Sequence, residues 1–297
     1  MFSSRQLANT SSPLAAKPFD PNHEYKLKVG FRISNHYLGK GASGCVNLGS
    51  LKSDGKKYAF KKIPIEDKNV IEKEIDIMAT LTALNPDYFV NLKGYLFIKE
   101  MAYICMDYAS GGSLANHLNE LNLSQQATIM LKTAKGVDMM HGIHITHNDL
   151  KAENILIEIT EDKNIVSKIC DFDLSTRCGI DSPQRVGTST FYSPELFDTR
   201  AVNTPQSDVY AMTMTFGQIL ARLKTKELQE RIKNCLNSTS FQEYISSGQR
   251  IPCDASESWH PKLAKLITWG WATNPDERPT ANDMAQELER IMPSFDS

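Results

Sequence analysis

The chain has 297 residues, of which 41% are hydrophobic and 23% are charged, and its formal net charge is −2. This composition is typical of a soluble globular protein of one or two lobes, and the balanced charge argues against nucleic-acid or anionic-membrane partners. The six cysteines lie singly without a CxxC pair, which indicates reduced thiols rather than a disulfide framework or a zinc site.

Residues 1–24 are rich in Ser, Pro and Asn, and we expect them to form a flexible N-terminal tail. They contain no apolar stretch long enough for a signal peptide. No run in the chain approaches the roughly 18 apolar residues of a membrane-spanning helix. We therefore expect a cytoplasmic protein without a membrane span. Nothing in the sequence indicates a particular oligomeric state.

Residues 25–63 are predicted to form strands. The segments "CVNLGSL" and "KYAFKKI" alternate with period two, and Asp54-Gly55 between them is typical of a hairpin turn. Two further strands are predicted in the segment 91–107, joined by a tight turn at Lys99-Glu100.

Ahead of the hairpin, Gly39, Gly41 and Gly44 have G-x-G-x-x-G spacing. A strand follows instead of a helix, which argues against a dinucleotide-binding unit. Two interpretations stay open: a plain glycine-rich turn, or a flap whose backbone N–H groups can approach phosphates.

Lys61 lies on the strand after the hairpin, and its neighbour Lys62 must point to the other face. The segment 66–84 is predicted to be a helix because apolar residues recur at helical spacing. Glu74 on this helix, directly before Ile75, is the favoured partner for Lys61, and Glu72 is the alternative.

The rest of the chain is predicted to be mainly helical, with the change near residues 110–112 and a helical pattern that begins at Leu114. We expect a helix over 124–143 with Ser124 as N-cap. Two short strands, in 154–159 and 166–174, flank a turn at 160–164. Further helices are expected over about 207–222, 225–235, 260–271 and 280–291, with a loop over 254–261. The fold class is thus α+β, with a small antiparallel sheet and one main helix beside a larger helical part.

The stretch "THNDLKAENIL" places His147, Asp149, Lys151 and Asn154 within eight positions of an otherwise apolar run. Such a stretch is either a solvated turn or a catalytic loop that handles a phosphoryl group. The stretch alone does not distinguish the two.

The order of several motifs along residues 30–292 resembles that of the eukaryotic-type protein kinase family. These motifs are "GKGASGCV", "YAFK", "MDYASGGSL", "HNDLKAEN", "DFD", "GTSTFYSPE", "SDVYAM" and "NPDERPT". The resemblance implies a bilobal kinase domain over 25–293. Its N-lobe would span about 25–106, its hinge about 107–112 and its C-lobe about 113–293.

The resemblance also implies the catalytic residues. Asp149 would accept the proton of the substrate hydroxyl, and Lys151 would lie near the γ-phosphate of ATP. Lys61 would hold the α- and β-phosphates and pair with Glu74. Asn154 and Asp171 would be oxygen ligands of Mg²⁺, with Mn²⁺ as an alternative.

The same resemblance implies where ATP binds. The glycine-rich flap would cover the phosphates, and the backbones of Asp107 and Ala109 would hydrogen-bond the adenine edge. Glu195 and Arg278 would form a structural ion pair. The apolar positions expected around adenine are Leu38, Val46, Ala59, Met106 and Leu156.

Three positions depart from the family pattern: Asn148 replaces the Arg before the catalytic Asp, Asp173 the Gly of the metal-binding motif, and Ala152 a Pro. The H-N-D-x-x-x-x-N spacing also resembles choline-kinase-like and aminoglycoside-kinase-like small-molecule kinases. The flap and the "GTSTFYSPE" segment favour a protein substrate, and "LKAEN" together with Thr188 favours Ser/Thr hydroxyls. A pseudokinase scaffold without turnover and a small-molecule kinase remain the alternatives.

Because Asn148 has no charge, it cannot clamp a phosphate on the activation segment, which runs from Asp171 to Glu195. We therefore expect this segment to order without phosphorylation. The alternative is that Arg177 or Arg185 binds such a phosphate in place of the missing Arg.

Overall fold

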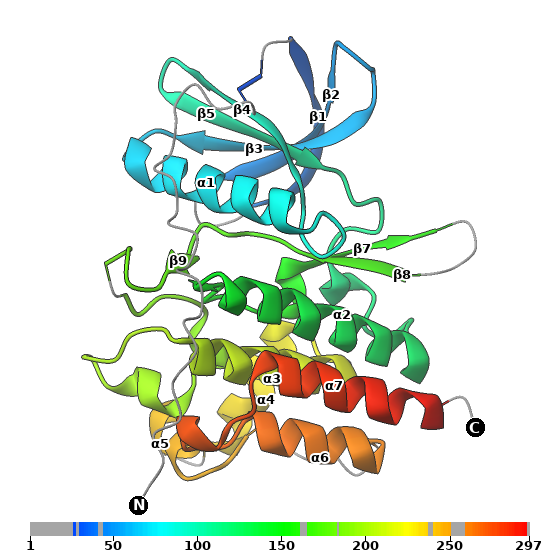
Figure 1. Ribbon diagram of the computed structural model, residues 1–297, viewed down its shortest axis with the longest axis vertical. Coiled ribbons are helices and arrows are strands. Elements are labelled where there is room, and N and C mark those ends of the chain that lie inside the picture. The colour runs from blue at the N-terminus through cyan, green and yellow to red at the C-terminus, as the bar shows by residue number, and fades with distance from the viewer. Residues whose placement is uncertain are drawn as a thin grey trace, which may run out of the picture.

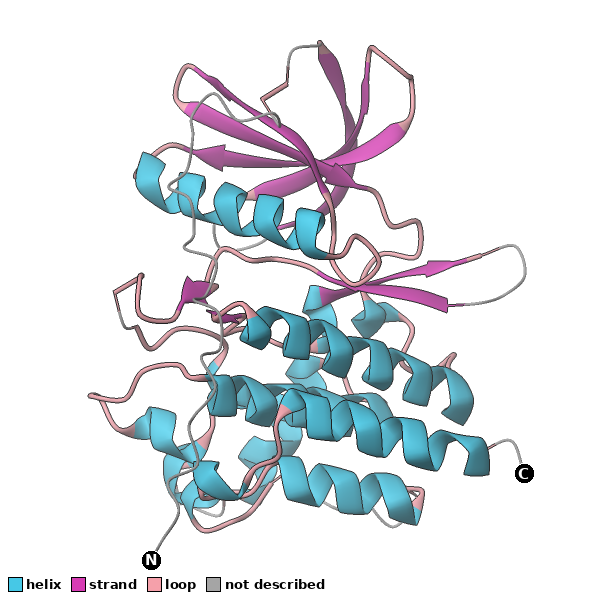
Figure 2. Ribbon diagram, in the orientation of Figure 1, coloured by secondary structure: helices cyan, strands magenta, loops and turns pink. Residues whose placement is uncertain are grey.

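The computed structural model describes residues 26–27, 30–40, 44–160, 165–182, 184–236, 240–250 and 259–295. The expected tail over 1–24, Gly41, the turn residues 161–164 and most of the expected loop over 254–261 lie outside these ranges. The expected α+β architecture is confirmed: a five-stranded sheet with one long helix stands above a mainly helical part (Figures 1 and 2).

The sheet has the strand order β1-β2-β3-β5-β4, and all its neighbouring strands are antiparallel. Helix α1 (Lys68–Leu84) lies across one face, between the sheet and the helical part (Figure 1). Its buried stripe includes Ile71, Ile75 and Met78, as the helical spacing predicts. The strands are β1 (Phe31–Lys40), β2 (Cys45–Leu51), β3 (Lys57–Pro64), β4 (Leu92–Ile98) and β5 (Met101–Asp107).

The register of the sheet decides which side chains share a face. Lys61 lies opposite Val46 on β2 and Ile104 on β5, and Ala59 lies opposite Met106. Directly opposed residues point to the same face, and neighbours along a strand point to opposite faces. These five side chains therefore share one face of the sheet.

Helix α3 (Pro205–Ala221) forms the centre of the helical part, because every residue from Ser207 to Ile219 is buried. A helix that is buried on all sides must be enclosed by other elements. The others are α2 (Leu123–Gly142), α4 (Thr225–Cys235), α5 (Phe241–Ser246), α6 (Pro261–Gly270) and α7 (Ala281–Ile291).

Two small antiparallel ribbons lie between the sheet and the helices (Figure 2). Strand β7 (Ile155–Ile159) pairs with β8 (Ile165–Ile169), and β6 (Ile145–Thr146) pairs with β9 (Thr176–Arg177). The short 3-10 turns are Leu114–Asn116, Ala152–Asn154, Ser189–Phe191, Pro194–Phe197, Pro275–Glu277 and Met292–Ser294.

Several sequence predictions need correction. The N-cap of α2 is Asn122, not Ser124, because the Asn122 side chain and Gln125 form a reciprocal capping box. The helical pattern from Leu114 gives only a single 3-10 turn, and α5 was not predicted. The strand expected over 166–174 ends at Ile169, shortly before Asp171, whose φ of 67° is incompatible with extended pairing.

No helix in the described part of the chain is both long enough and apolar enough to cross a membrane. Within the same residues, Cys45, Cys105, Cys170, Cys178 and Cys235 are free thiols, as the sequence predicts.

Candidate active site

Lys61 and Glu74 form an ion pair between β3 and α1. The Lys61 Nζ lies 2.7 Å from Glu74 Oε1, and both side chains are almost completely buried. Glu72, the alternative partner, instead pairs with Lys68 one helical turn away.

Two further carboxylates surround the same ammonium. Lys61 Nζ lies 3.1 Å from Asp171 Oδ1 and 3.9 Å from Asp173 Oδ2. Burial acts to lower the pKa of Lys61, but the charges of Glu74, Asp171 and Asp173 outweigh it and raise that pKa above its ordinary value. Lys61 is therefore a buried cation whose charge is compensated by carboxylates from α1 and from the segment after β8.

Asp149 is the centre of a hydrogen-bond cluster on the loop 147–154, which the resemblance predicts to be the catalytic loop. Its Oδ2 accepts from Lys151 Nζ at 2.6 Å and from Asn154 Nδ2 at 3.0 Å. Its Oδ1 accepts from the Thr188 hydroxyl at 2.7 Å and from the Thr188 backbone N–H at 2.9 Å. Lys151 also donates to the Thr188 hydroxyl at 2.8 Å. Both carboxylate oxygens are thus held in a defined orientation.

Asp208, which the sequence reasoning did not assign to the site, supports this loop from α3. Its carboxylate is 1% exposed and accepts from the backbone N–H groups of His147 and Asn148 at 2.7 and 2.8 Å. The Nε2 atom of His141 lies 3.1 Å from Asp208 Oδ2. An acidic residue at the start of the apolar run "SDVYAMTMTF" was the available signal, since buried carboxylates require partners.

Asn148 joins the catalytic loop to the start of the activation segment. Its side-chain Nδ2 donates to Leu174 O at 2.8 Å and to Thr176 Oγ1 at 3.0 Å. Its φ is 70°, a conformation that Asn tolerates better than most residues. Asn148 therefore binds the segment through neutral hydrogen bonds.

The two arginines considered as substitutes for the missing Arg have other partners. Arg177 Nη2 lies 2.6 Å from Asp76 Oδ2 on helix α1, and Arg185 Nη1 donates to Leu196 O at 3.1 Å. At the end of the segment, the expected ion pair is formed: two Arg278 nitrogens each lie 2.7 Å from an oxygen of Glu195.

The two expected metal ligands, Asn154 and Asp171, lie on neighbouring backbone segments. Cys170 N–H, directly before Asp171, donates to Asn154 O at 3.0 Å. The Asn154 Nδ2 is bonded to Asp149, so the Asn154 side-chain oxygen points elsewhere, while the Asp171 side chain is 30% exposed. An amide oxygen and a carboxylate are hard donors that fit Mg²⁺.

The positions expected around adenine come from both parts of the molecule. Ala59 and Met106 are directly opposed on the face that also bears Val46 and Lys61. Leu156 on β7 forms an isolated antiparallel β-bridge with Ser113. Leu156 therefore lies beside the segment that follows β5. Leu38 lies on β1, next to an irregularity in the β1–β2 register.

The glycines of the expected flap differ in their surroundings. Gly39 pairs with Val46, and a Cβ on it would meet open space. A Cβ on Gly44 would lie 2.3 Å from Lys62 O, so this glycine is required for the close approach of β2 to β3.

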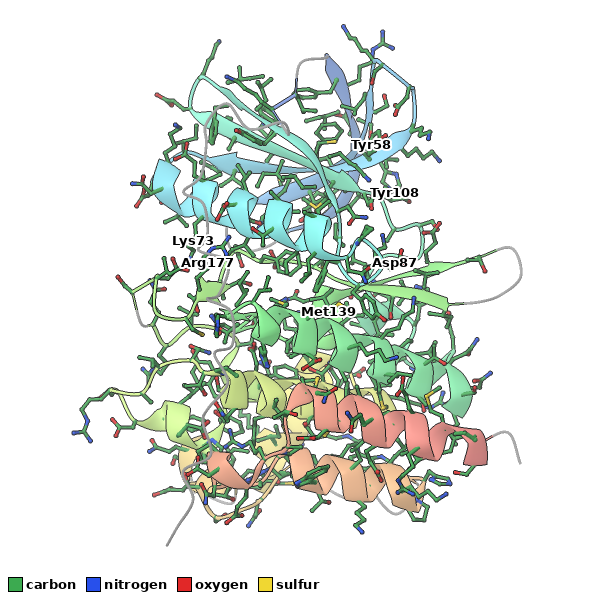
Figure 3. The ribbon with its side chains drawn as sticks, in the orientation of Figure 1. Tyr58, Lys73, Asp87, Tyr108, Met139 and Arg177 are labelled. Carbon is green, nitrogen blue, oxygen red and sulfur yellow. The ribbon has the colours of Figure 1, made fainter. Side chains whose placement is uncertain are left out.

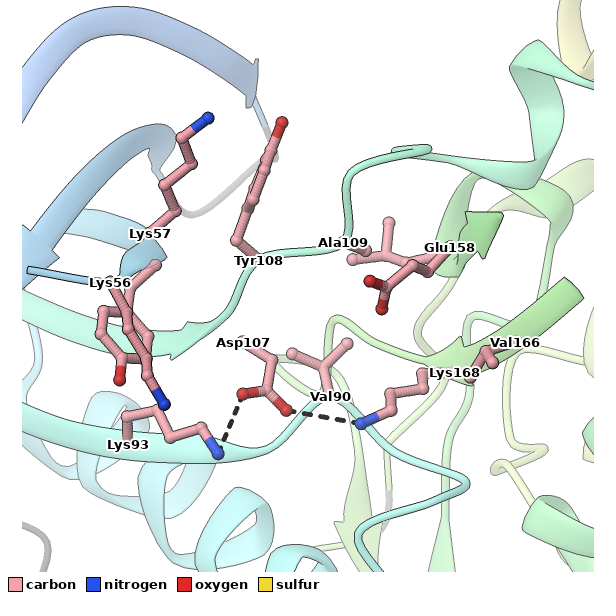
Figure 4. Close-up of a pocket in the computed structure, with 12 residues that line it drawn as sticks. Lys56, Lys57, Val90, Lys93, Asp107, Tyr108, Ala109, Glu158, Val166 and Lys168 are labelled. Carbon is pink, nitrogen blue, oxygen red and sulfur yellow. Dashed lines mark hydrogen bonds and ion pairs between the residues drawn. The ribbon is translucent and has the colours of Figure 1, made fainter. Parts of the chain in front are cut away.

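Asp107 points away from the face that carries Met106, because it pairs with Tyr58 on the other side of the strands. Its carboxylate accepts from Asn91 at 2.6 Å and pairs with Lys93 at 2.9 Å and Lys168 at 3.4 Å (Figure 4). Burial acts to raise the pKa of Asp107, but the hydrogen bonds from Lys93 and Asn91 lower it below its ordinary value.

A cavity of about 340 Å³ lies beside this carboxylate. Its lining includes the backbone segment 107–109, Lys56, Lys57 and Glu158 (Figure 4). The Asp107 side chain faces this cavity, and its backbone N–H already donates to Asn91 O at 3.1 Å. Ala109 belongs to the same connecting segment.

Residues 33–288 match the protein kinase domain. The chain is 29% identical over 259 residues to a probable serine/threonine-protein kinase of Dictyostelium discoideum, which covers 86% of this chain and 18% of that protein. It is 30% identical over 283 residues to the probable serine/threonine-protein kinase drkA of the same organism, with 90% and 40% covered.

The human NUAK family SNF1-like kinase 1 is 29% identical over 275 residues, with 89% of this chain and 39% of that protein covered. The chain thus spans less than half the length of these relatives.

Proposed function

Because this chain belongs to the protein kinase domain family, we propose that it transfers the γ-phosphoryl group of ATP to Ser or Thr hydroxyls of protein substrates. Membership of the family implies the use of ATP and a divalent cation in general terms. The observation that carries the proposal is the orientation of Asp149, whose two oxygens are held by Lys151, Asn154 and Thr188.

The residues of the cluster would divide the work of phosphoryl transfer. Asp149 would accept the proton of the attacking hydroxyl, and its fixed orientation supplies the positioning on which this reaction mainly depends. Lys151, bonded to both Asp149 and Thr188, would lie near the γ-phosphate. Lys61 would hold the α- and β-phosphates in the position that its pair with Glu74 determines.

Asn154 and Asp171 would hold Mg²⁺ or Mn²⁺. When bound, the cation neutralises negative charge on the phosphates. Asp171 lies 3.1 Å from the ammonium of Lys61, the group that would hold the phosphates. Asn154 is fixed by its bonds to Asp149.

Ser and Thr are the acceptors we favour, for two reasons. The sequence pattern that includes Thr188, near the end of the activation segment, favours Ser/Thr acceptors, and the Thr188 hydroxyl contacts Asp149. In addition, the relatives from Dictyostelium discoideum are named as probable serine/threonine-protein kinases.

The main alternative is a scaffold that binds nucleotide without turnover. Asp173 in place of the usual Gly is the feature that favours it. Against it, Lys61, Asp149, Asn154 and Asp171 are all present, and each has a charged or polar partner within the same cluster. A small-molecule kinase is disfavoured because the matched domain includes the flap and the whole segment to Glu195.

The test compares Asp149→Asn and Asp171→Asn with wild type. ATP consumption and phosphate incorporation into a generic protein substrate are measured with and without Mg²⁺, together with the affinity for Mg²⁺-ATP. Asp149→Asn should bind nucleotide normally and lose turnover, whereas Asp171→Asn should also lose Mg²⁺-dependent affinity. Asp87→Asn, which alters an exposed carboxylate, is the control. Wild-type turnover in either active-site variant would contradict the assignment, and phosphoamino-acid analysis identifies the acceptor.

A further inference from the structure

Arg177 connects three parts of the molecule. Its backbone belongs to β9, which pairs with β6 directly before the catalytic loop, where Ile145 lies opposite Arg177. Its guanidinium crosses to helix α1, where Nη2 lies 2.6 Å from Asp76 Oδ2 and 3.0 Å from Thr80 Oγ1. The Arg177 side chain is only 10% exposed, so water screens this ion pair weakly.

Helix α1 is held on two different stripes. Asp76 and Thr80 are one turn apart and form the stripe that receives Arg177. Glu74 lies two residues before Asp76, about 200° around the helix, and pairs with Lys61 on the sheet. A rotation or outward shift of α1 would therefore break both ion pairs, so each contact favours the helix position that the other requires.

The backbone around Arg177 is also held against the catalytic loop and the residues before it. Asn148 Nδ2 binds Leu174 O and Thr176 Oγ1 on the residues just before it, and Cys178 N–H donates to His144 O at 2.8 Å. These bonds involve neutral groups and the backbone. The Arg177 guanidinium is paired with a carboxylate of the chain itself, so its position requires no phosphorylated residue.

We propose that Arg177 is a positioning residue for catalysis: its ion pair with Asp76 holds α1, and thereby Glu74 and Lys61, in place without phosphorylation of the activation segment. The inference rests on the proposed kinase function. It also predicts that the Arg177–Asp76 pair acts through Glu74, a property that a merely structural ion pair would lack.

A weaker contact between the same two elements provides a matched control. Lys73 projects from α1 toward the activation segment (Figure 3), and its Nζ lies 3.9 Å from Asp181 Oδ2. Its side chain is 25% exposed, and Asp181 also accepts the Arg177 backbone N–H. Removal of this longer, more exposed pair should have little effect.

The experiment uses the full chain after phosphatase treatment, with mass spectrometry to confirm that the segment carries no phosphate. The variants are Arg177→Met, the near-isosteric Asp76→Asn, Lys73→Met, and the exchange Arg177→Asp/Asp76→Arg. Arg177→Met and Asp76→Asn are also made in a Glu74→Gln background. The measurements are kcat and KM for ATP, Mg²⁺-ATP affinity and thermal unfolding.

We expect Arg177→Met and Asp76→Asn to lower kcat/KM by about tenfold or more, within the range of typical coupling energies. Lys73→Met should stay within about twofold of wild type. The exchange variant should recover part of the loss. In the Glu74→Gln background, the loss caused by either substitution should shrink to within about threefold.

Two results would overturn the proposal. One is wild-type kcat/KM in Asp76→Asn, which remains informative even if Arg177→Met does not fold. The other is an undiminished loss in the Glu74→Gln background. Absence of turnover in the wild-type protein would instead contradict the proposed function. The same pattern would then be sought in Mg²⁺-ATP affinity, where unchanged values in both single variants would exclude the positioning role.

Discussion

The hydroxyl of Thr188 donates to the carboxylate of Asp149 over 2.7 Å, and the Thr188 backbone N–H donates to the same oxygen over 2.9 Å. The two residues are 39 positions apart. The contact therefore joins the end of the activation segment to the catalytic loop, and any displacement of the segment changes the surroundings of Asp149.

Thr188→Val should reduce kcat, because the isosteric side chain removes a hydrogen bond to a charged group. Such a bond is worth about 1.5–3 kcal/mol, which corresponds to a loss of roughly tenfold to a hundredfold. Thr188→Ser should retain most activity. Thr190→Val, which removes a hydroxyl that binds Gln229, is the control in the same segment. The initial rate of each variant is compared with that of wild type. Equal rates for Thr188→Val and wild type would refute the role of the hydroxyl.

Gly187→Ala should impair both stability and turnover. Gly187 has a φ of 113°, and a Cβ there would lie 2.2 Å from Asn148 O, directly before Asp149. The strained backbone costs about 1–3 kcal/mol, and the clash displaces the catalytic loop. Gly179→Ala is the matched control, since its φ is 78° but its Cβ would meet open space. Denaturant unfolding and kcat are measured, and similar turnover losses in the two variants would exclude the clash as a cause.

The Glu195–Arg278 pair should make stability depend on pH in the acid range. Burial acts to raise the pKa of Glu195, but the hydrogen bonds and charge of Arg278 lower it below its ordinary value of 4.5. Because the unfolded state then binds the proton more readily, the contribution is complete above about pH 4.5 and is lost as the pH falls through the folded pKa.

Glu195→Gln should remove this part of the pH dependence, so the difference from wild type shrinks below pH 4.5. At pH 7 the variant should lose about 2 kcal/mol, less than the roughly 3–5 kcal/mol of a fully buried pair because Glu195 is partly exposed. Urea unfolding over pH 3–7 measures both effects, with the exposed Glu100→Gln as control. A constant difference over the whole range would contradict the assignment.

Asp173→Gly should ease displacement of Phe172. Phe172 is 1% exposed and packs against the rings of His147 and Phe89, at centroid distances of 5.5 and 6.2 Å. Asp173 is not among the described residues with positive φ, and its Cβ makes such conformations costlier by roughly 1 kcal/mol.

Compounds that require a displaced Phe172 should therefore bind Asp173→Gly about fivefold more tightly. Asp173→Ala removes the carboxylate but keeps the Cβ, so it should show no gain. Affinities are measured by calorimetry. An equal gain in the Ala variant would assign the effect to charge, and no gain in the Gly variant would dismiss it.

Much of the fold could be predicted because local patterns agree with it. The period-two segments on either side of Asp54-Gly55 became β2 and β3, and the apolar spacing around Ile75 became α1. The N-cap of α2 was predicted two residues late, because the apolar Leu123 lies between Asn122 and the polar run that follows. Helix α5 has only six residues, too short for a clear period.

The candidate site was partly predictable for the same reason. Asp149, Lys151 and Asn154 are neighbours in sequence, so their proximity follows from one short loop. The contact between Arg177 and Asp76 spans 101 positions, and nothing in either local sequence indicates the other. Charged pairs of this kind depend on the final arrangement of elements, which residue spacing alone does not specify.

The attachment of the catalytic loop to Asp208 has a consequence for the dynamics of the protein. The backbone N–H groups of His147 and Asn148 donate to the carboxylate of Asp208, which lies in the buried stretch Ser207–Ile219 of helix α3. They can exchange with solvent only when the loop separates from that helix. Neither the sheet nor α1 supplies a partner to these two bonds. The loop should therefore exchange with the most slowly opening cooperative unit of the molecule.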